Sequence, residues 1–209
     1  MDLRILKDVN ELWSKIYPYL SVQVMRCYGR ENGEALELGP FSGGISMELA
    51  RLHPGLNLTI AAQDRDVVDY LRKEMEEAGL YHKIALKWSA LENLCFADGR
   101  FDLVVFRGAY FFLDEEGRML REIYRVLKEG GLAFVGGGYG KDTPQPLIDE
   151  IADKSRDLND RLGRKRVTEE ELKIMVNKAG LTSQAGVEKE GGLWLLIRKQ
   201  TTRLDADHS

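Results

Sequence analysis

The stretch from Ala35 to Ala50 reads ALELGPFSGGISMELA and changes character twice. Residues 35–38 are a short apolar run of the kind that forms a buried strand, residues 39–44 are a glycine-rich loop, and apolar residues at helical spacing follow. A strand, a glycine-rich loop and a helix in this order open a doubly wound α/β sheet. Glycines let the backbone approach a ligand, and the first turn of a helix offers unpaired N–H groups. The stretch therefore predicts a ligand site.

The alternation of strands and helices continues along the chain. The sequence predicts further strands at 56–62, 83–88, 101–106 and 132–135, and helices at about 67–78 and 115–128. Two final segments, 182–188 and 193–198, are separated by two glycines and predict a hairpin. We therefore predict an α/β, Rossmann-like, doubly wound fold with helices on both faces. Its mostly parallel sheet of about seven strands is closed by the antiparallel hairpin.

The other segments are interpreted as additions to one domain. Residues 1–32 form a helical cap whose helix, at 9–28, is broken or kinked at Pro18. The core spans 33–198 and contains a helical insertion at 144–166; after it, a capping box at 168–171 starts another helix. The glycines at 136–140 predict a loop or a close backbone approach, and residues 199–209 a flexible tail.

Composition excludes several classes of function. The 209 residues include 30 Lys and Arg against 34 Asp and Glu, a net charge of −4, which disfavours a binder of nucleic acid or of an anionic membrane. Two cysteines, predicted to be buried free thiols, and three scattered histidines indicate no metal site and no hydrolase triad. Without a signal sequence or a long apolar run, the chain is expected to be soluble and cytoplasmic.

Asp64 follows the second predicted strand, 21 positions after Gly43. An acid at about this distance suits the two hydroxyls of a ribose. The alternative is that Asp64 caps the next helix, a role for which Asp66 competes. For Gly39 and Gly43, the alternative is plain turn chemistry.

The stretch 35–50 also resembles motif I of the class I S-adenosylmethionine-dependent methyltransferases. Residues 89–131 are similar to the small-molecule, methyltransferase type 11-like branch of that superfamily, through ALENLCF at 90–96, DGRFDLVV at 98–105 and REIYRVLKEGG at 121–131. The resemblance covers roughly 33–136, with a weaker match at the closing hairpin. That hairpin disfavours a nicotinamide-dependent dehydrogenase, whose sheet would continue with a parallel strand.

The resemblance implies S-adenosylmethionine as cofactor, S-adenosylhomocysteine as product, and roles for the residues of the loop. Glu37 would orient the loop and the amino-acid end of the cofactor. Gly39 and Gly43 would let the loop pack against methionine and ribose. Asp64 would hold the ribose hydroxyls, and Arg65 would lie against the adenine.

The resemblance implies further contacts after the third and fourth strands. Ser89, Ala90 and Leu91 occupy the positions of the adenine-edge contacts. Arg107 and Gly108 follow the fourth strand, where backbone carbonyls meet the methionine amine.

Two positions depart from the family pattern. Phe41 replaces the middle glycine, so the loop with Pro40 and Phe41 is stiffer and bulkier than the pattern. Ser89 replaces the acid that usually ends the third strand. These departures motivate a second hypothesis, a non-catalytic module that binds S-adenosylmethionine or S-adenosylhomocysteine for regulation. An NAD-dependent oxidoreductase is a third.

Methyl transfer by in-line displacement needs positioning more than a general base, so the sequence identifies no catalytic residue. The segment 107–110 reads RGAY, unlike the Asn/Asp-Pro-Pro-Tyr of enzymes that methylate amino groups of DNA and protein, which favours a small-molecule acceptor. The acceptor-side candidates are aromatic, with core or lid packing as the alternative: Trp13, Tyr17, Tyr110, Phe111 and Tyr139. The basic stretch 154–166 is either a solvated helix face or a site for an anionic substrate or partner. The sequence leaves the oligomeric state open, with a homodimer among the options.

Overall fold

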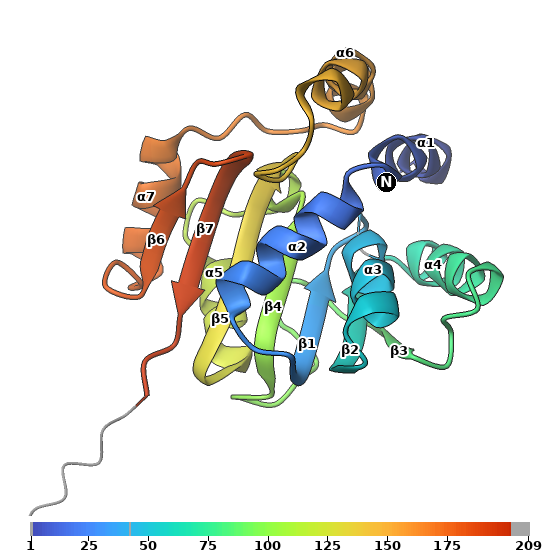
Figure 1. The fold of residues 1–209 in the computed structure, drawn as a ribbon. Coiled ribbons are helices and arrows are strands. Elements are labelled where there is room, and N and C mark those ends of the chain that lie inside the picture. The colour runs from blue at the N-terminus through green and yellow to red at the C-terminus, as the bar shows by residue number, and fades with distance from the viewer. Residues whose placement is uncertain (1, 42, 202–209) are drawn as a thin grey trace, which may run out of the picture.

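Across residues 2–41 and 43–201, which the computed structural model describes, seven strands form one sheet in the order β3-β2-β1-β4-β5-β7-β6. Strands β1 to β5 pair in parallel, and β7 is antiparallel to both β5 and β6 (Figure 1). The strands are β1 (Asn32–Leu38), β2 (Gly55–Ala62), β3 (Ile84–Trp88), β4 (Phe101–Arg107), β5 (Leu127–Gly138), β6 (Ala185–Glu188) and β7 (Gly192–Arg198). The predicted sheet with its closing hairpin is confirmed.

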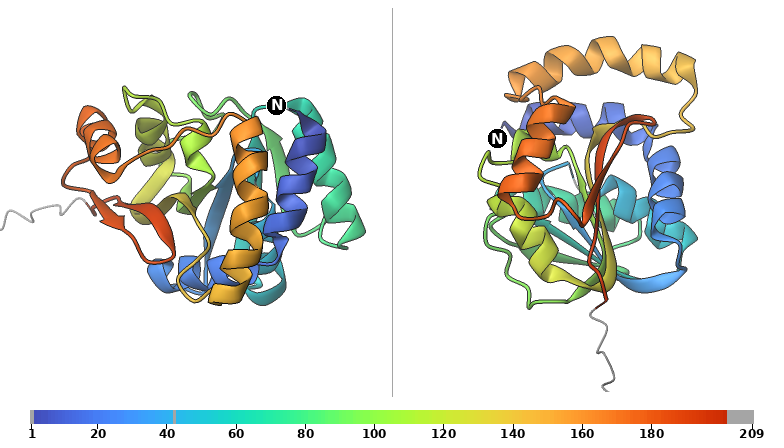
Figure 2. Two further views of the ribbon diagram at one scale, coloured as in Figure 1. Left: turned by 90° about the horizontal axis from the view of Figure 1, so that it is seen from above. Right: turned by 90° about the vertical axis from the view of Figure 1, so that its left-hand side faces the viewer.

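Helices cover both faces of the sheet. They are α1 (Leu3–Ser14), α2 (Tyr17–Tyr28), α3 (Gly44–Leu52), α4 (Arg65–Glu77), the 3-10 turn η1 (Ala109–Phe111), α5 (Arg118–Val126), α6 (Gln145–Arg161) and α7 (Glu169–Lys178). Helices α2, α3 and α4 lie on one face, and α5 and α7 on the other (Figures 1 and 2). Helices α1 and α6 lie side by side above the edge where the parallel strands end.

Strand β4 shows why the sheet needs cover on both sides. Successive side chains of a strand point to opposite faces. Leu103 and Val105 accordingly join the apolar cluster under α2, α3 and α4, while Val104 and Phe106 join the cluster under α5 and α7. The continuous apolar run of this strand is therefore the signature of a strand buried on both faces.

Several local predictions change. The predicted break near Pro18 is present, because α1 ends at Ser14 and α2 begins at Tyr17, but α1 already begins at Leu3. Pro18 is an early residue of α2, where its missing N–H is harmless. Residues 136–138 are strand rather than loop, although the close backbone approach is real: a Cβ on Gly136 would lie 2.3 Å from the carbonyl oxygen of Leu193. Cys95 is exposed, so the prediction of two buried thiols is wrong.

The capping box is present as predicted, with Thr168 and Glu171 bonded to each other's backbone N–H groups. Residues 202–209 of the predicted tail lie outside the described residues, whereas Lys199 at its start donates its N–H to Gly131. In the part of the chain that the structure describes, we find no helix with the length and apolarity needed to cross a membrane.

Candidate functional site

The order of the strands places a crevice between β1 and β4. The helix after β1, α3, lies on one face of the sheet, and the helix after β4, α5, lies on the other. The two loops therefore diverge at the carboxyl edge, and this is where open α/β sheets bind their ligands. Two cavities lie there, one on each side of the loop that follows β1.

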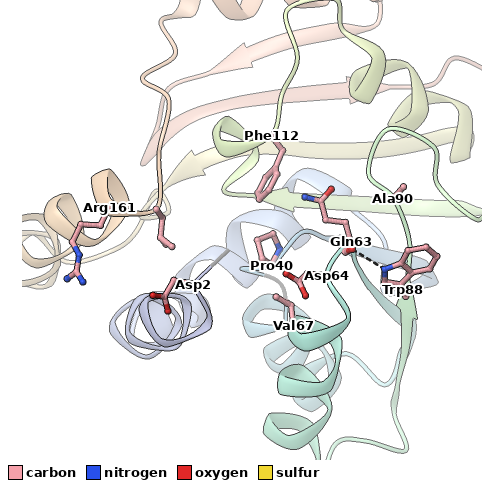
Figure 3. Close-up of a pocket in the computed structure, with 10 residues that line it drawn as sticks. Asp2, Pro40, Gln63, Asp64, Val67, Trp88, Ala90, Phe112 and Arg161 are labelled. Carbon is pink, nitrogen blue, oxygen red and sulfur yellow. Dashed lines mark hydrogen bonds between the residues drawn. The ribbon is translucent and has the colours of Figure 1, made fainter.

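The first, which we call the strand-end cleft, has a volume of about 730 Å³. The loops after β1, β2 and β3 contribute its floor, and α1 and the end of α6 face them (Figure 3). Its lining residues are Asp2, Pro40, Gln63, Asp64, Val67, Trp88, Ala90, Phe112, Arg161 and Leu162.

Asp64 both caps a helix and lines this cleft. It is the N-cap of α4, and its Oδ1 accepts the N–H of Asp66 at 3.0 Å, so the capping alternative describes a bond that is present. The same carboxylate lines the cleft. A carboxylate offers about four lone-pair positions, so one Asp side chain can cap a helix and also accept other donors.

Trp88 is a lining residue that sequence reasoning missed. Its side chain is half exposed, and its indole Nε1 donates to the backbone oxygen of Gln63 at 3.0 Å. The guanidinium of Arg65 lies 4.9 Å from the centre of the indole ring and is not among the lining residues. The available signal was a large aromatic residue at the last position of a strand that ends at the site.

The three adenine-edge candidates, Ser89, Ala90 and Leu91, lie in different environments in the structure. Ala90 lines the cleft, whereas Leu91 belongs to the apolar core. Ser89 is buried, and its Oγ accepts the N–H of Cys95 at 3.0 Å and donates to the Ala90 oxygen at 3.2 Å. Ser89, which stands where the family pattern has an acid, therefore stabilises the loop after β3 by hydrogen bonds within it.

The glycines of the loop after β1 are needed where they stand. Gly39 has φ 95° and Gly43 has φ 108°, in the left-handed region that side chains disfavour. A Cβ on Gly39 would also lie 2.8 Å from the ring of Phe106. Plain turn chemistry thus accounts for the conformation, and the same conformation brings Pro40 to the cleft. Ser42 of this loop lies outside the described residues.

Glu37 ties the loop to the start of α3. The carboxylate is buried, and its Oε2 accepts the N–H of Ser46 at 2.7 Å. Burial raises the pKa of Glu37 above its usual range, against the opposing effect of hydrogen bonds from Ser46 and Gly43. Its Oε1 has no hydrogen-bond partner among the described residues.

The second cavity, which we call the aromatic cavity, has a volume of about 310 Å³. Four of the five acceptor-side candidates line it: Trp13, Tyr110, Phe111 and Tyr139. The other lining residues are Val9, Phe41, Arg107, Gly108, Gly137, Gly138, Asn159, Arg164, Gly191 and Gly192. The fifth candidate, Tyr17, is buried and lines a different depression between α1, α3 and α4.

Phe41 does not project into the strand-end cleft. Its ring is buried on the side of the aromatic cavity, 4.8 Å from the ring of Phe111 and tight against Gly108, where a Cβ would lie 2.4 Å from it. The bulky residue at the glycine position therefore leaves the cleft itself open.

Arg107 was predicted from the resemblance to act through its backbone, but its side chain is the more unusual feature. The side chain is 5% exposed, and its guanidinium lies 4.1 Å from the centre of the Trp13 ring. Its Nε and Nη1 have no hydrogen-bond partner among the described residues. Burial lowers the pKa of Arg107 from its usual range.

Tyr110 and Tyr17 are poor candidates for a general base. Burial raises the pKa of Tyr110, whose hydroxyl donates to the carbonyl oxygen of Leu193 at 2.5 Å. Burial also raises the pKa of Tyr17, although the charge of Arg107 opposes this shift. Both phenols are therefore protonated near neutral pH.

One wall separates the cleft and the cavity. Pro40 faces the strand-end cleft while the next described residue, Phe41, faces the aromatic cavity; likewise Phe112 faces the cleft and Phe111 the cavity. The arrangement places two small-molecule spaces back to back at the carboxyl edge of the sheet.

Comparison with known proteins agrees with this architecture. The family described as "Methyltransferase domain" matches residues 36–135. The sarcosine/dimethylglycine N-methyltransferase of Halorhodospira halochloris is 30% identical over 142 residues, which are 64% of this chain and 49% of that protein. The ubiquinone/menaquinone biosynthesis C-methyltransferase UbiE of Desulfotalea psychrophila is 29% identical over 101 residues, 47% of this chain and 39% of that protein. The chain thus spans about half the length, or less, of these relatives.

A solved structure shares nearly the whole fold. A protein of Methanococcus maripaludis, described as an S-adenosyl-L-methionine-dependent methyltransferase, superposes with a TM-score of 0.79 at 25% identity, covering 95% of this chain and 94% of the other. The structure named "PigF with SAH" superposes with a TM-score of 0.70 at 21% identity, covering 93% and 59%, and shares the fold. Motifs, strand order, closing hairpin and family match agree: residues 36–135 form a methyltransferase domain of the type 11 family, within a chain that has the fold of the S-adenosylmethionine-dependent methyltransferases.

Proposed function

We propose that this chain transfers a methyl group from S-adenosylmethionine to a small-molecule acceptor. The observation that carries the proposal is the pair of spaces at the switch point, a larger cleft with a carboxylate and an indole, and a smaller cavity with aromatic walls. Their volumes fall in or near the range of about 300–1,000 Å³ typical of small-molecule sites.

The residues of the strand-end cleft fit a nucleoside. Asp64 would accept the ribose hydroxyls while keeping its helix cap, and the exposed face of Trp88 would lie against the adenine. Arg65 would act on the adenine indirectly, by holding the indole from its other side. Ala90 would line the adenine edge, with Ser89 and Leu91 behind it.

The amino-acid end of the cofactor would lie near the loop after β1. Glu37, whose buried carboxylate bonds to the start of α3, would orient this loop, and the backbone of Gly108 would meet the methionine amine. When bound, the cofactor would supply an electrophilic methyl group; the acceptor would provide the electron pair of the new bond, and the sulfur would keep the pair of the broken C–S bond as the thioether of S-adenosylhomocysteine. The protein's contribution would be to hold the acceptor in line.

The relatives support a small-molecule acceptor, because their names include both N-methyltransferases and C-methyltransferases of small metabolites. They lend no support to a regulatory module or to an oxidoreductase. The buried position of Phe41, away from the strand-end cleft, also weakens one of the two grounds for the regulatory hypothesis.

Calorimetric titration with S-adenosylmethionine, S-adenosylhomocysteine and NADH tests the proposal. We expect both sulfur nucleotides to bind and NADH to show no heat of binding. A well-folded sample that binds neither sulfur nucleotide would overturn it. Binding without turnover across a panel of acceptors would instead favour the regulatory module.

A further inference from the structure

Arg107 is a buried cation whose hydrogen bonds are incomplete. It ends β4, and its side chain points to the face of the sheet that α2 and α3 cover. The titratable groups that act on it are Tyr17, Glu37 and Tyr139. Yet in residues 2–41 and 43–201 no carboxylate lies within ion-pair distance of the guanidinium, and two of its nitrogens lack partners. Buried polar groups are nearly always satisfied, so this exception needs an explanation.

Stacking compensates the charge of Arg107 only in part. The guanidinium lies over the ring of Trp13 at 4.1 Å, with Tyr17 and Phe41 at 5.7 Å. Ring faces attract a cation but accept no N–H in the plane of the guanidinium. The two unpaired in-plane donors, Nε and Nη1, are themselves buried, so a ligand would reach them from the aromatic cavity that Arg107 lines.

The aromatic cavity has a composition that suits such a ligand. Arg107 lines it from the sheet, and Arg164 lines it from the segment after α6, with its Nε also unpaired. None of the described residues that line it is an Asp or a Glu. The stacked pair of Trp13 and Tyr139, with ring centres 5.0 Å apart, adds a flat apolar wall.

We propose that the acceptor carries a carboxylate on a small, flat, apolar body, and that Arg107 binds this carboxylate in the aromatic cavity while Arg164 closes over it. A guanidinium presents planar, charge-assisted donors that match a carboxylate. The inference deepens the proposed methyl transfer and rests on it, since it names the class of acceptor for the same site. The proposal also assigns a binding role to one residue of the basic stretch 154–166, because Arg164 belongs to that stretch.

The cofactor carries a carboxylate too, in its methionine portion, and is the competing partner for Arg107. S-adenosylhomocysteine has this carboxylate and 5′-methylthioadenosine lacks it. Comparing their affinities therefore shows whether Arg107 binds the carboxylate of the cofactor or that of the acceptor. If Arg107 binds the acceptor, Arg107→Met binds S-adenosylhomocysteine as the wild type does. A loss of affinity for S-adenosylhomocysteine, with unchanged affinity for 5′-methylthioadenosine, would assign Arg107 to the cofactor and overturn the proposal.

The direct test is calorimetric titration of the full chain, saturated with S-adenosylhomocysteine, with benzoate, phenylacetate and hexanoate, each against its primary amide. We expect at least one carboxylate to bind more tightly than its amide, and Arg107→Met to reduce that affinity by about 10- to 100-fold. Arg164→Gln should reduce it less. Arg156→Gln, an exposed position on α6 paired with Asp153, is the matched control and should leave it unchanged.

Thermal unfolding separates a binding role from a structural one. Removing an unpaired buried charge should raise the Tm of Arg107→Met in the absence of ligand. A fall in Tm, with carboxylate affinity unchanged, would make Arg107 a structural residue. No preference for any carboxylate over its amide, in a protein that binds S-adenosylhomocysteine, would refute this inference and leave the proposed methyl transfer standing. Absence of nucleotide binding would refute both.

Discussion

Asp64 combines a structural and a proposed functional role in a single side chain. Its Oδ1 caps α4, and its carboxylate lines the strand-end cleft. Because Asn is as good an N-cap as Asp, a substitution to Asn keeps the cap and removes the charge. The two roles can therefore be separated at one position.

We predict that Asp64→Asn binds S-adenosylhomocysteine about 10- to 100-fold more weakly than the wild type at unchanged stability. Asp64→Ala should show the same loss of affinity and lose about 1 kcal/mol of unfolding free energy with the cap. Calorimetry and urea unfolding measure the two effects. Wild-type affinity in Asp64→Asn would remove Asp64 from the nucleotide site.

Glu37 gives the protein a pH dependence of opposite sign to that of most carboxylates. Its folded-state pKa is raised by burial, so the folded state binds its proton more tightly than the unfolded state does. The contribution of Glu37 is therefore most favourable below pH 4.5, the ordinary pKa of a glutamate, and is lost as pH rises through the raised pKa.

We predict that Glu37→Gln becomes more stable relative to the wild type as pH increases from about 4.5 towards neutrality. Urea unfolding of both proteins across this range gives the difference, in which the titration of all other groups largely cancels. A constant difference would show that Glu37 has an ordinary pKa in the folded state.

At the scale of elements, the capping box of α7 is a local feature whose two residues line neither of the two cavities. Thr168 Oγ1 accepts the N–H of Glu171 at 3.2 Å, and Glu171 accepts the N–H of Thr168 at 2.8 Å. We predict that Thr168→Ala lowers the free energy of unfolding by about 1 kcal/mol without changing nucleotide affinity. Thr168→Ser, which retains the hydroxyl, is the control. An equal loss in both variants would mean that the methyl group, not the cap, is responsible.

Long apolar elements could be predicted from sequence, whereas elements defined by partners far along the chain could not. Strand β4 could be predicted from its uninterrupted apolar run, which it has because it is buried on both faces. Residues 136–138 lack side chains and gave a loop signal, yet β7 holds them in the sheet by backbone pairing that no local pattern encodes. Only the close approach of the two backbones was readable from the glycines.

The site shows the same division. Asp64 and the loop glycines follow from spacing along one strand–helix–strand unit, which runs from β1 through α3 to the end of β2. The aromatic cavity instead joins α1, the loop after β4, the end of β5 and the segment after α6. The surroundings of the Arg107 side chain are created only when these elements pack together. The sequence therefore indicated the position of Arg107 but not its incomplete hydrogen bonding.

At the scale of the whole molecule, a ligand that binds only the folded state must stabilise it. We predict that S-adenosylhomocysteine at 100 times its Kd adds about 2.7 kcal/mol of stability. For a chain of this length the expected rise in Tm is about 5–10 °C. A thermal melt with and without the nucleotide measures it, and adenosine at equal concentration serves as the weaker comparison. A Tm that does not respond to the nucleotide would contradict a site in the folded protein.

The wall shared by the strand-end cleft and the aromatic cavity constrains any attempt to redesign the acceptor range. A larger or smaller residue at Phe41 or Phe111 would also shift its neighbour in the chain, Pro40 or Phe112, which lines the strand-end cleft. Tyr139 lines only the aromatic cavity, from the far end of β5. Directed evolution towards new acceptors should therefore begin at Tyr139, where substitutions are expected to change acceptor selectivity without lowering the affinity for the nucleotide.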